Sequence, residues 1–138
     1  MNIQPYLSFE GRAEEAIEFY KSTLGATVEM LLRFKDMPAD QQSMITPGTE
    51  NKVMHASIKV GETSIPLSDG QCGGKAVFSG ITLILNADSD GEAERLFGAI
   101  AGSGGQVRMP ITETFFATRF GICADKFGVA WMVMNPKP

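Results

Sequence analysis

The sequence predicts an α+β protein made of tandem βαβββ modules, whose strands form a curved mixed sheet around a cleft. Two observations predict this class. The order strand, helix, strand, strand, strand occurs twice, and the two predicted helices, over 13–24 and 91–102, carry similar residues at matching places. A length of 138 residues suits one domain. We therefore expect a single domain over 1–138, with a first module over 1–69 and a second over 79–138.

The first module contains four predicted strands and one helix. Apolar residues recur at helical spacing between Ala13 and Leu24, and Gly25 then ends the helix in a left-handed conformation. Alternation of polar and apolar residues predicts strands over 2–9, 27–36, 52–60 and 63–69. The second of these strands is expected to place four apolar residues on one face: Val28, Met30, Leu32 and Phe34.

The second module repeats this order after a linker over 70–78. Asp88, Ser89 and Asp90 offer oxygens that cap the start of a helix. The buried face of that helix is expected to consist of Ala93, Leu96, Phe97 and Ile100. Strands are predicted over 80–87, 106–114, 116–124 and 128–135. Each module is therefore expected to form a small sheet with one helix on its convex face.

Composition and charge exclude several classes of partner. The net charge is −4 at pH 7, and the chain has no basic stripe of the kind that binds nucleic acid. No run of about 18 apolar residues predicts a membrane span. The first residues show no basic region followed by an apolar stretch, so no export signal is expected. Cys72 and Cys123 are therefore expected to be reduced thiols in a cytoplasmic protein.

Residue blocks along almost the whole chain match a known family. The most specific block is Asp125-Lys126-Phe127-Gly128-Val129, followed by Trp131-Met132. The other blocks are Pro5-Tyr6-Leu7-Ser8-Phe9, Phe19-Tyr20 with Leu24-Gly25, Met54-His55-Ala56, Ser68-Asp69 and Glu113-Thr114-Phe115-Phe116-Ala117. With these blocks the chain resembles the PhnB-like branch of the vicinal oxygen chelate superfamily, which includes glyoxalase I, extradiol dioxygenases and bleomycin-resistance proteins. Members of this branch often carry the inherited name 3-demethylubiquinone-9 3-methyltransferase.

The resemblance implies a place for one divalent metal ion, with ligands from the first, fourth, fifth and eighth strands. Strand parity assigns these places to Gln4, Pro66, Gly80 and Met132. Only Gln4 offers an oxygen donor, because proline and glycine have no donor side chain and the methionine thioether suits Cu(I). We therefore expect neither a metal ion nor a cofactor.

The candidate ligand-binding residues are those expected to point into the cleft. They are Gln4, Tyr6, His55, Ser68, Glu113 and Phe116. His55 is the only histidine, and it either hydrogen-bonds within the sheet, contacts a ligand or acts as a general base. Glu29 and Arg33 of the second predicted strand are expected on the same side, where they either line the cleft or pair with each other across the surface. The second module is expected to supply a methionine-lined wall with Thr82, Ile84, Ala130, Met132 and Met134.

The hairpin between the sixth and seventh strands allows two interpretations. Glu113, Phe115, Phe116, Arg119 and Phe120 lie around it. Its aromatic rings either cover the cleft against a ligand or pack against the helix or a partner subunit. The parity of Trp131, by contrast, places it against the helix, and we expect it in the core.

The sequence favours a metal-free protein that binds a small organic molecule. The alternatives are a metal-dependent lyase, isomerase or dioxygenase of the same superfamily, and a dimeric interaction scaffold. A methyltransferase that uses S-adenosylmethionine normally needs a larger βαβ fold with a glycine-rich first turn, and the sequence contains no such motif.

A homodimer is also expected. Short open sheets expose strand edges that can pair with another chain, and twofold assembly is the commonest kind. The resemblance implies that strands one and eight lie near the subunit contact, or that units swap between chains. The apolar residues available for an interface of about 1,000 Å² are Met1, Ile3, Phe115, Phe116 and Met134.

Overall fold

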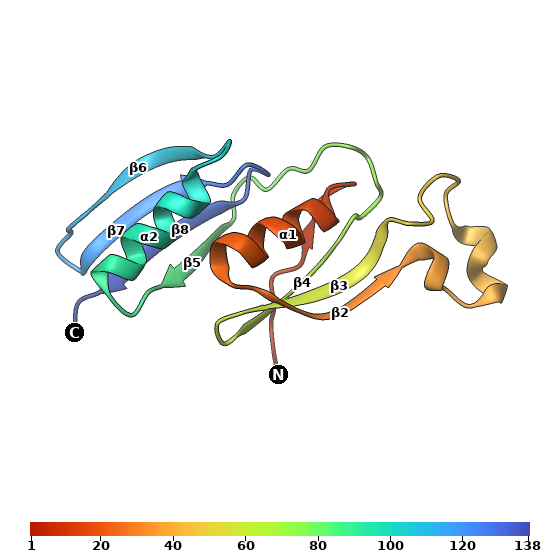
Figure 1. The fold of residues 1–138 in the computed structure, drawn as a ribbon, viewed down its shortest axis with the longest axis horizontal. Helices are drawn as coiled ribbons and strands as arrows, with labels where there is room; N and C mark the ends of the chain where they lie inside the picture. The colour runs from red at the N-terminus through yellow and green to blue at the C-terminus, as the bar shows by residue number, and fades with distance from the viewer. The chain divides into compact units, whose positions relative to one another are not determined.

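The computed structural model describes residues 1–138 and divides into two compact units, Met1–Ala76 and Val77–Pro138. Each unit contains one four-stranded mixed sheet with one α-helix lying over it (Figure 1). The strand order is β1-β4-β3-β2 in the first unit and β5-β8-β7-β6 in the second. The second order repeats the first with every strand number raised by four, so the prediction of a tandem βαβββ α+β fold is confirmed. None of the helices has the length and apolar character needed to cross a membrane.

The first unit contains β1 (Leu7–Ser8), α1 (Ala13–Leu24), β2 (Thr27–Arg33), β3 (Val53–Val60) and β4 (Thr63–Ser68). The helix has the predicted bounds, and Gly25 ends it with a φ of 68°. The first strand is much shorter than the predicted 2–9. It pairs with β4 in parallel, with Leu7 opposite Leu67. In this register Tyr6 lies opposite Pro66, and Pro66 has no N–H to donate to the first strand. The ladder therefore begins only at Leu7.

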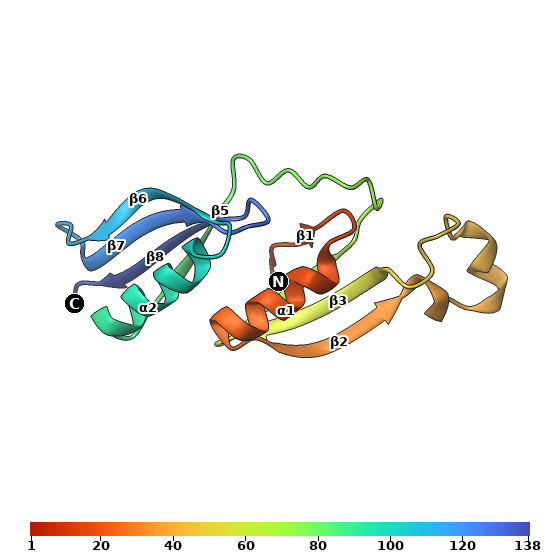
Figure 2. The same ribbon diagram turned by 45° about the horizontal axis from the view of Figure 1, so that its top comes forward.

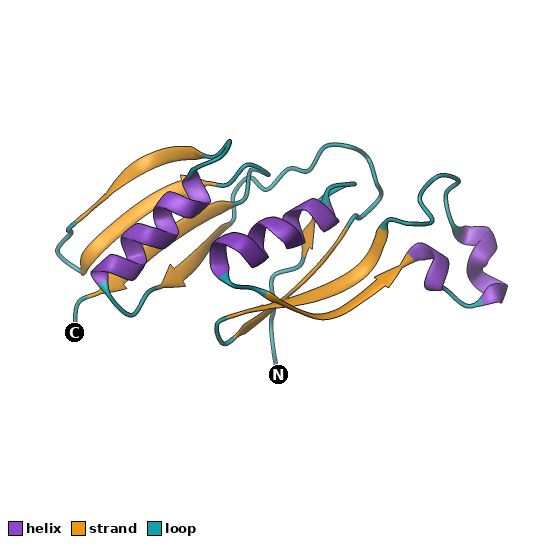
Figure 3. Ribbon diagram, viewed as in Figure 1, coloured by secondary structure: helices purple, strands orange, loops and turns teal.

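The second strand also ends earlier than predicted. Two short 3₁₀ helices, Phe34–Asp36 and Ala39–Met44, follow β2 and extend beyond the end of the β2–β3 pair (Figures 2 and 3). A register shift between Val28 and Met30 places Val28 opposite Ile58 but Met30 opposite Ser57. The prediction that Val28 and Met30 share a face is therefore wrong, because the inserted residue at a bulge reverses the alternation.

One buried carboxylate holds the first unit together. Asp69 follows β4, and its Oδ1 accepts hydrogen bonds from the backbone N–H groups of Gly11 at 3.0 Å and Ala13 at 2.7 Å. Its Oδ2 accepts from the N–H of Val53 at 2.7 Å. The side chain of Arg12, the residue before α1, makes no capping hydrogen bond. Asp69 therefore supplies from a distant strand the acceptor that α1 needs at its N-terminus.

The second unit contains β5 (Thr82–Asn86), α2 (Asp90–Ala101), β6 (Gln106–Thr112), β7 (Ala117–Ala124) and β8 (Ala130–Pro136). Ser89 caps α2 as predicted, since its side-chain oxygen accepts from the N–H of Glu92. The buried residues of α2 are the four that were predicted: Ala93, Leu96, Phe97 and Ile100. Trp131 is buried, which confirms its predicted place in the core, and its Nε1 donates to Asp125 at 3.0 Å.

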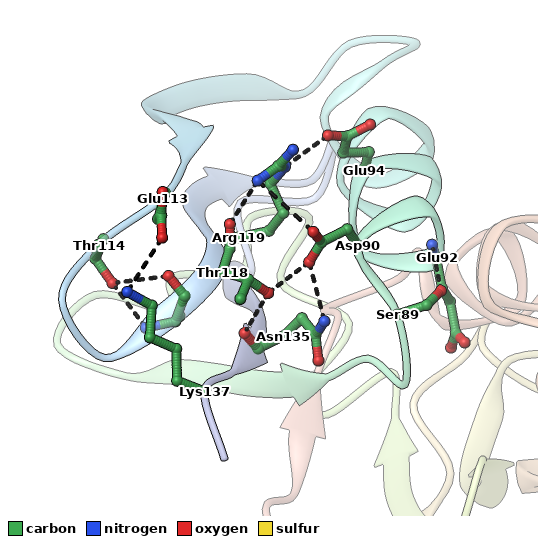
Figure 4. Close-up of polar contacts among 11 residues, drawn as sticks. Ser89, Asp90, Glu92, Glu94, Glu113, Thr114, Thr118, Arg119, Asn135 and Lys137 are labelled. Atoms are coloured by element: carbon green, nitrogen blue, oxygen red, sulfur yellow. Dashed lines mark hydrogen bonds and ion pairs between the residues drawn. The ribbon is translucent and has the colours of Figure 1, made fainter.

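Further polar contacts join α2 to its sheet (Figure 4). Asp90, in the first turn of α2, accepts hydrogen bonds from the Thr118 hydroxyl at 2.5 Å and from Nδ2 of Asn135 at 2.9 Å. Arg119 donates through Nε to Glu94 at 2.7 Å. Arg119 therefore lies on the helix side of the sheet, where it contacts α2.

Candidate functional site

The first sheet has one face covered by α1 and one face opposite it, which we call the polar face. Along β3, Ala56 and Ile58 are fully buried beneath α1, whereas His55 and Ser57 alternate with them and are half-buried. Side chains of successive strand residues point to opposite faces. His55 and Ser57 therefore belong to the polar face, as the strand parity predicted.

Tyr6 and His55 form a pair on this face. The Tyr6 hydroxyl lies 3.3 Å from Nδ1 of His55, and the two rings stack with centroids 5.7 Å apart at 26°. Tyr6 remains 49% exposed. Whichever group donates the shared proton, the pair keeps one further polar N–H or O–H donor for another molecule.

A carboxylate with serine hydroxyls lies beside this pair. The Ser57 hydroxyl donates to Oε1 of Glu29 at 2.9 Å. Hydrogen bonds from the hydroxyls of Ser64 and Ser57 lower the pKa of Glu29, so its side chain is ionised at neutral pH. His55 and Ser57 are two residues apart on one strand, so their Cα atoms are about 7 Å apart and the two polar groups are neighbours on this face.

Glu29 lies on the polar face, as alternation along the strand predicts, and it does not pair with Arg33, which is not on that face. Arg33 instead makes hydrogen bonds of 2.9 and 2.8 Å to the carboxylate of Glu14 on α1. The bulge between Val28 and Met30 is the physical reason, because it reverses the alternation beyond Glu29 and so turns Arg33 to the helix side. No periodicity signal in the sequence marks this bulge.

The other predicted residues of the first unit have different environments. Gln4 is exposed, and its Nε2 donates to the backbone oxygen of Ser64 at 3.1 Å. Ser68 is only 4% exposed, and its hydroxyl oxygen accepts from the N–H of Gly70. The chain turns sharply after Ser68 and is hydrogen-bonded to the segment that precedes α1. The expectation that Ser68 is accessible to a ligand is therefore wrong.

Glu113 and Phe116 lie in the second unit, at the hairpin between β6 and β7. Glu113 forms an ion pair with Nζ of Lys137 at 3.1 Å (Figure 4). The Phe116 ring packs edge-on against Phe115 and Phe120, with centroid distances of 5.1 Å in both cases. Neither residue is part of the polar face of the first sheet.

The second sheet also has a face opposite its helix, and that face is mostly apolar. Gly121 faces α2, because a Cβ at this position would lie 2.7 Å from the ring of Phe97. Its neighbours along β7 therefore point away from the helix. The register places the following side chains on that opposite face: Ile84, Phe120, Ile122, Met132 and Met134. Thr82 and Ala130 lie on the same face by this register, so all five residues of the predicted methionine-lined wall share it, together with Asn86.

The four places that the resemblance assigns to metal ligands do not form a donor set. Gly80 lies outside β5, and the strand residue that pairs with Met132 is Ile84, which also lacks a donor atom. The Gln4 amide is engaged with Ser64, as described above. The chain contains no group of three or more His, Cys, Asp or Glu side chains arranged to hold a metal ion. The residues at these places therefore do not fit the superfamily's metal ion.

Comparison with known proteins gives a consistent result. The family model described as 3-demethylubiquinone-9 3-methyltransferase matches residues 1–134. Protein YjdN of Escherichia coli K12 is 38% identical over 141 residues, covering 96% of this chain and 94% of that protein. The structure of protein PA1353 from Pseudomonas aeruginosa is 40% identical with a TM-score of 0.83, covering 98% of this chain and 97% of that one.

Two further structures identify the branch and the fold. A PhnB protein from Bacillus cereus is 26% identical with a TM-score of 0.78, covering 98% of this chain and 99% of that one. A glyoxylase/bleomycin resistance protein/dioxygenase domain from Frankia is 16% identical with a TM-score of 0.67, covering 99% and 95%, and shows the shared fold. The chain therefore belongs to the PhnB-like family described as 3-demethylubiquinone-9 3-methyltransferase, and it has the fold of the glyoxalase/bleomycin resistance/dioxygenase proteins.

Proposed function

We propose that this protein binds a small organic molecule on the polar face of its first sheet, without a resident metal ion. The observation that carries the proposal is the exposed Tyr6–His55 pair beside the ionised Glu29. The pair offers a hydrogen-bond donor, and the Glu29 carboxylate keeps acceptor positions beyond those used by the two serines. In small-molecule sites, a small number of convergent polar groups such as these fixes the orientation of the ligand.

The metal-free part of the proposal is supported by the chemistry of the residues at the expected ligand places. Pro66 and Gly80 have no donor atoms, and Met132 has only a soft thioether. Stoichiometric Ni, Mn, Zn or Fe in untagged protein, lost on Gln4→Ala, would contradict this part and favour a metal-dependent lyase, isomerase or dioxygenase instead.

The methyltransferase activity in the family's description is not part of the proposal. Enzymes that bind S-adenosylmethionine normally use a larger parallel βαβ fold with a glycine-rich turn, whereas each unit here has a four-stranded mixed sheet. Because the family's description names a methyltransferase, S-adenosylmethionine is included in the ligand screen as a probe. A saturable stabilisation by this compound would argue for the named activity.

The experiment is a thermal-shift screen of metabolites and antibiotics, followed by titration of each hit. A ligand at about 100 times its dissociation constant stabilises the folded protein by roughly 2.7 kcal/mol. We expect Tyr6→Phe and His55→Gln to weaken each true hit by about tenfold, the equivalent of one hydrogen bond of about 1.4 kcal/mol. Glu18→Gln, an exposed change on α1, is the matched control. Hits with equal affinity for all four proteins would place the binding site elsewhere.

We propose further that the protein acts as a homodimer in the reducing cytoplasm. The supporting observation for the location is that Cys72 and Cys123 are free thiols. Burial raises the pKa of the Cys123 thiol to about 11 and also raises that of Cys72, so both stay protonated and unreactive at neutral pH.

A further inference from the structure

Glu29 is an ionised carboxylate that no cation of the chain neutralises by direct contact. The Ser57 hydroxyl donates to its Oε1 at 2.9 Å, and Ser64 provides a second hydroxyl. Arg33, the arginine of β2, forms its ion pair with α1 instead. Lys59 is exposed on the polar face, but it forms no ion pair with Glu29 and acts on it only through its charge at longer range. The polar face therefore carries a negative group with open acceptor positions.

The two serines fix the place of this carboxylate. Glu29 belongs to β2, Ser57 to the neighbouring strand β3, and Ser64 to β4 on the far side of β3. The side chain of Glu29 therefore extends from its own strand across β3. Because hydrogen bonds from two other strands already order the carboxylate, binding a further donor costs it little conformational entropy.

Two apolar side chains lie beside these polar groups. In the β2–β3 register Met30 is opposite Ser57 and Leu32 is opposite His55, so both share the polar face. They are 37% and 39% exposed. An apolar stem that covers them is removed from water, while polar groups at its two ends can bind on either side.

We propose that the ligand of this face is a small primary amine, protonated at neutral pH, with an apolar stem and a hydrogen-bond acceptor at its other end. This inference rests on the proposed function and names the chemical class of its ligand. The ammonium group donates to Glu29, the stem covers Met30 and Leu32, and the acceptor receives the donor of the Tyr6–His55 pair. Charge-assisted hydrogen bonds are roughly twice as strong as neutral ones, so the charge of the amine adds to its affinity.

The test uses two pairs of probes that differ only at the charged end. Tyramine is compared with tyrosol, and aminohexanol with hexanediol, so that a hydroxyl replaces the ammonium group in each pair. Calorimetric titration gives the dissociation constants at low and at physiological salt. We expect the wild type to bind each amine about fivefold more tightly than its alcohol at low salt, the upper range for an exposed ion pair. Added salt should reduce this preference, because it screens the charges.

Three variants assign the preference to Glu29. Glu29→Gln should abolish it, while the affinity for each alcohol stays within about twofold. Lys59→Gln should have the opposite effect and strengthen both amines, because it removes a like charge from the same face. Glu18→Gln removes the same charge as Glu29→Gln, but from α1, and this matched control should behave as the wild type. Circular dichroism verifies that each variant is folded.

The outcomes separate the amine from the proposed function. The amine class is overturned if neither amine binds saturably, if the amines bind no better than the alcohols, or if Glu29→Gln binds them as well as the wild type does. In each of these cases the proposed function still stands if Tyr6→Phe and His55→Gln weaken other hits of the screen. If these two variants weaken no hit at all, the proposed function is overturned as well.

Discussion

The two units share a strand order, yet they hold the first turns of their helices with different groups. In the first unit the acceptor is Asp69, which lies 56 residues after Ala13 in the chain. In the second unit it is Ser89, three residues before the N–H that it accepts from. The buried Asp125 of the second unit is also a local device, since its partners follow it by two, four and six residues. A repeated topology therefore does not require repeated polar contacts.

The sheet faces opposite the helices differ in the same way. The first carries the Tyr6–His55 pair and Glu29, and the second carries methionine, isoleucine and phenylalanine side chains. Packing against the helix constrains the side chains on the covered side of each sheet, whereas the opposite face carries different side chains in the two units.

The largest expected effect comes from removing the long-range acceptor. Asp69→Ala leaves the N–H groups of Gly11, Ala13 and Val53 without their carboxylate, and we expect a loss of about 3–5 kcal/mol in the free energy of unfolding. Urea unfolding followed by circular dichroism measures it. Asp88→Ala, at an exposed carboxylate, is the control and should cost little. If Asp69→Ala lowered the free energy of unfolding no more than the loss of a local cap does, the two units would not differ in the way described.

A smaller effect is expected at the local cap. Ser89→Ala removes the acceptor for the N–H of Glu92, and caps of this kind contribute about 1 kcal/mol. Trp131 is the only tryptophan and lies in the second unit, so its fluorescence during urea unfolding reports on this change. Ser89→Asp should retain most of the stability, because aspartate also caps helices well. If Ser89→Asp were as unstable as Ser89→Ala, loss of the helix cap would not be the cause of the lost stability.

The smallest effect concerns acidification. Hydrogen bonds from Thr118 and Asn135, with the charge of Arg119, lower the pKa of Asp90 below its ordinary value of 3.8. A carboxyl with a lowered pKa stabilises the folded state above its unfolded pKa, and this contribution is lost as the pH falls through the folded pKa. We therefore expect Asp90→Asn to be less stable than the wild type at pH 6, with a smaller difference near pH 3. A difference that is constant from pH 6 to pH 3 would show that the charge of Asp90 contributes nothing.

The sequence by itself determined the order of elements and the composition of each helix. The apolar periodicity between Ala13 and Leu24, followed by Gly25 in a left-handed conformation, was sufficient to predict both ends of α1. It was sufficient because a helix is specified by contacts within a few residues. The same holds for Ser89 and the buried face of α2. Alternation along one strand likewise placed His55 on the face away from α1.

Only the tertiary structure decided the features that depend on pairing between distant strands. The bulge in β2 turned Arg33 to α1 and away from Glu29, and the turn after β4 buried Ser68. The register of β1 against Pro66 shortened the first strand. None of these leaves a periodic signal in the sequence, because strand register and long-range acceptors such as Asp69 are set by partners 16 to 60 residues away.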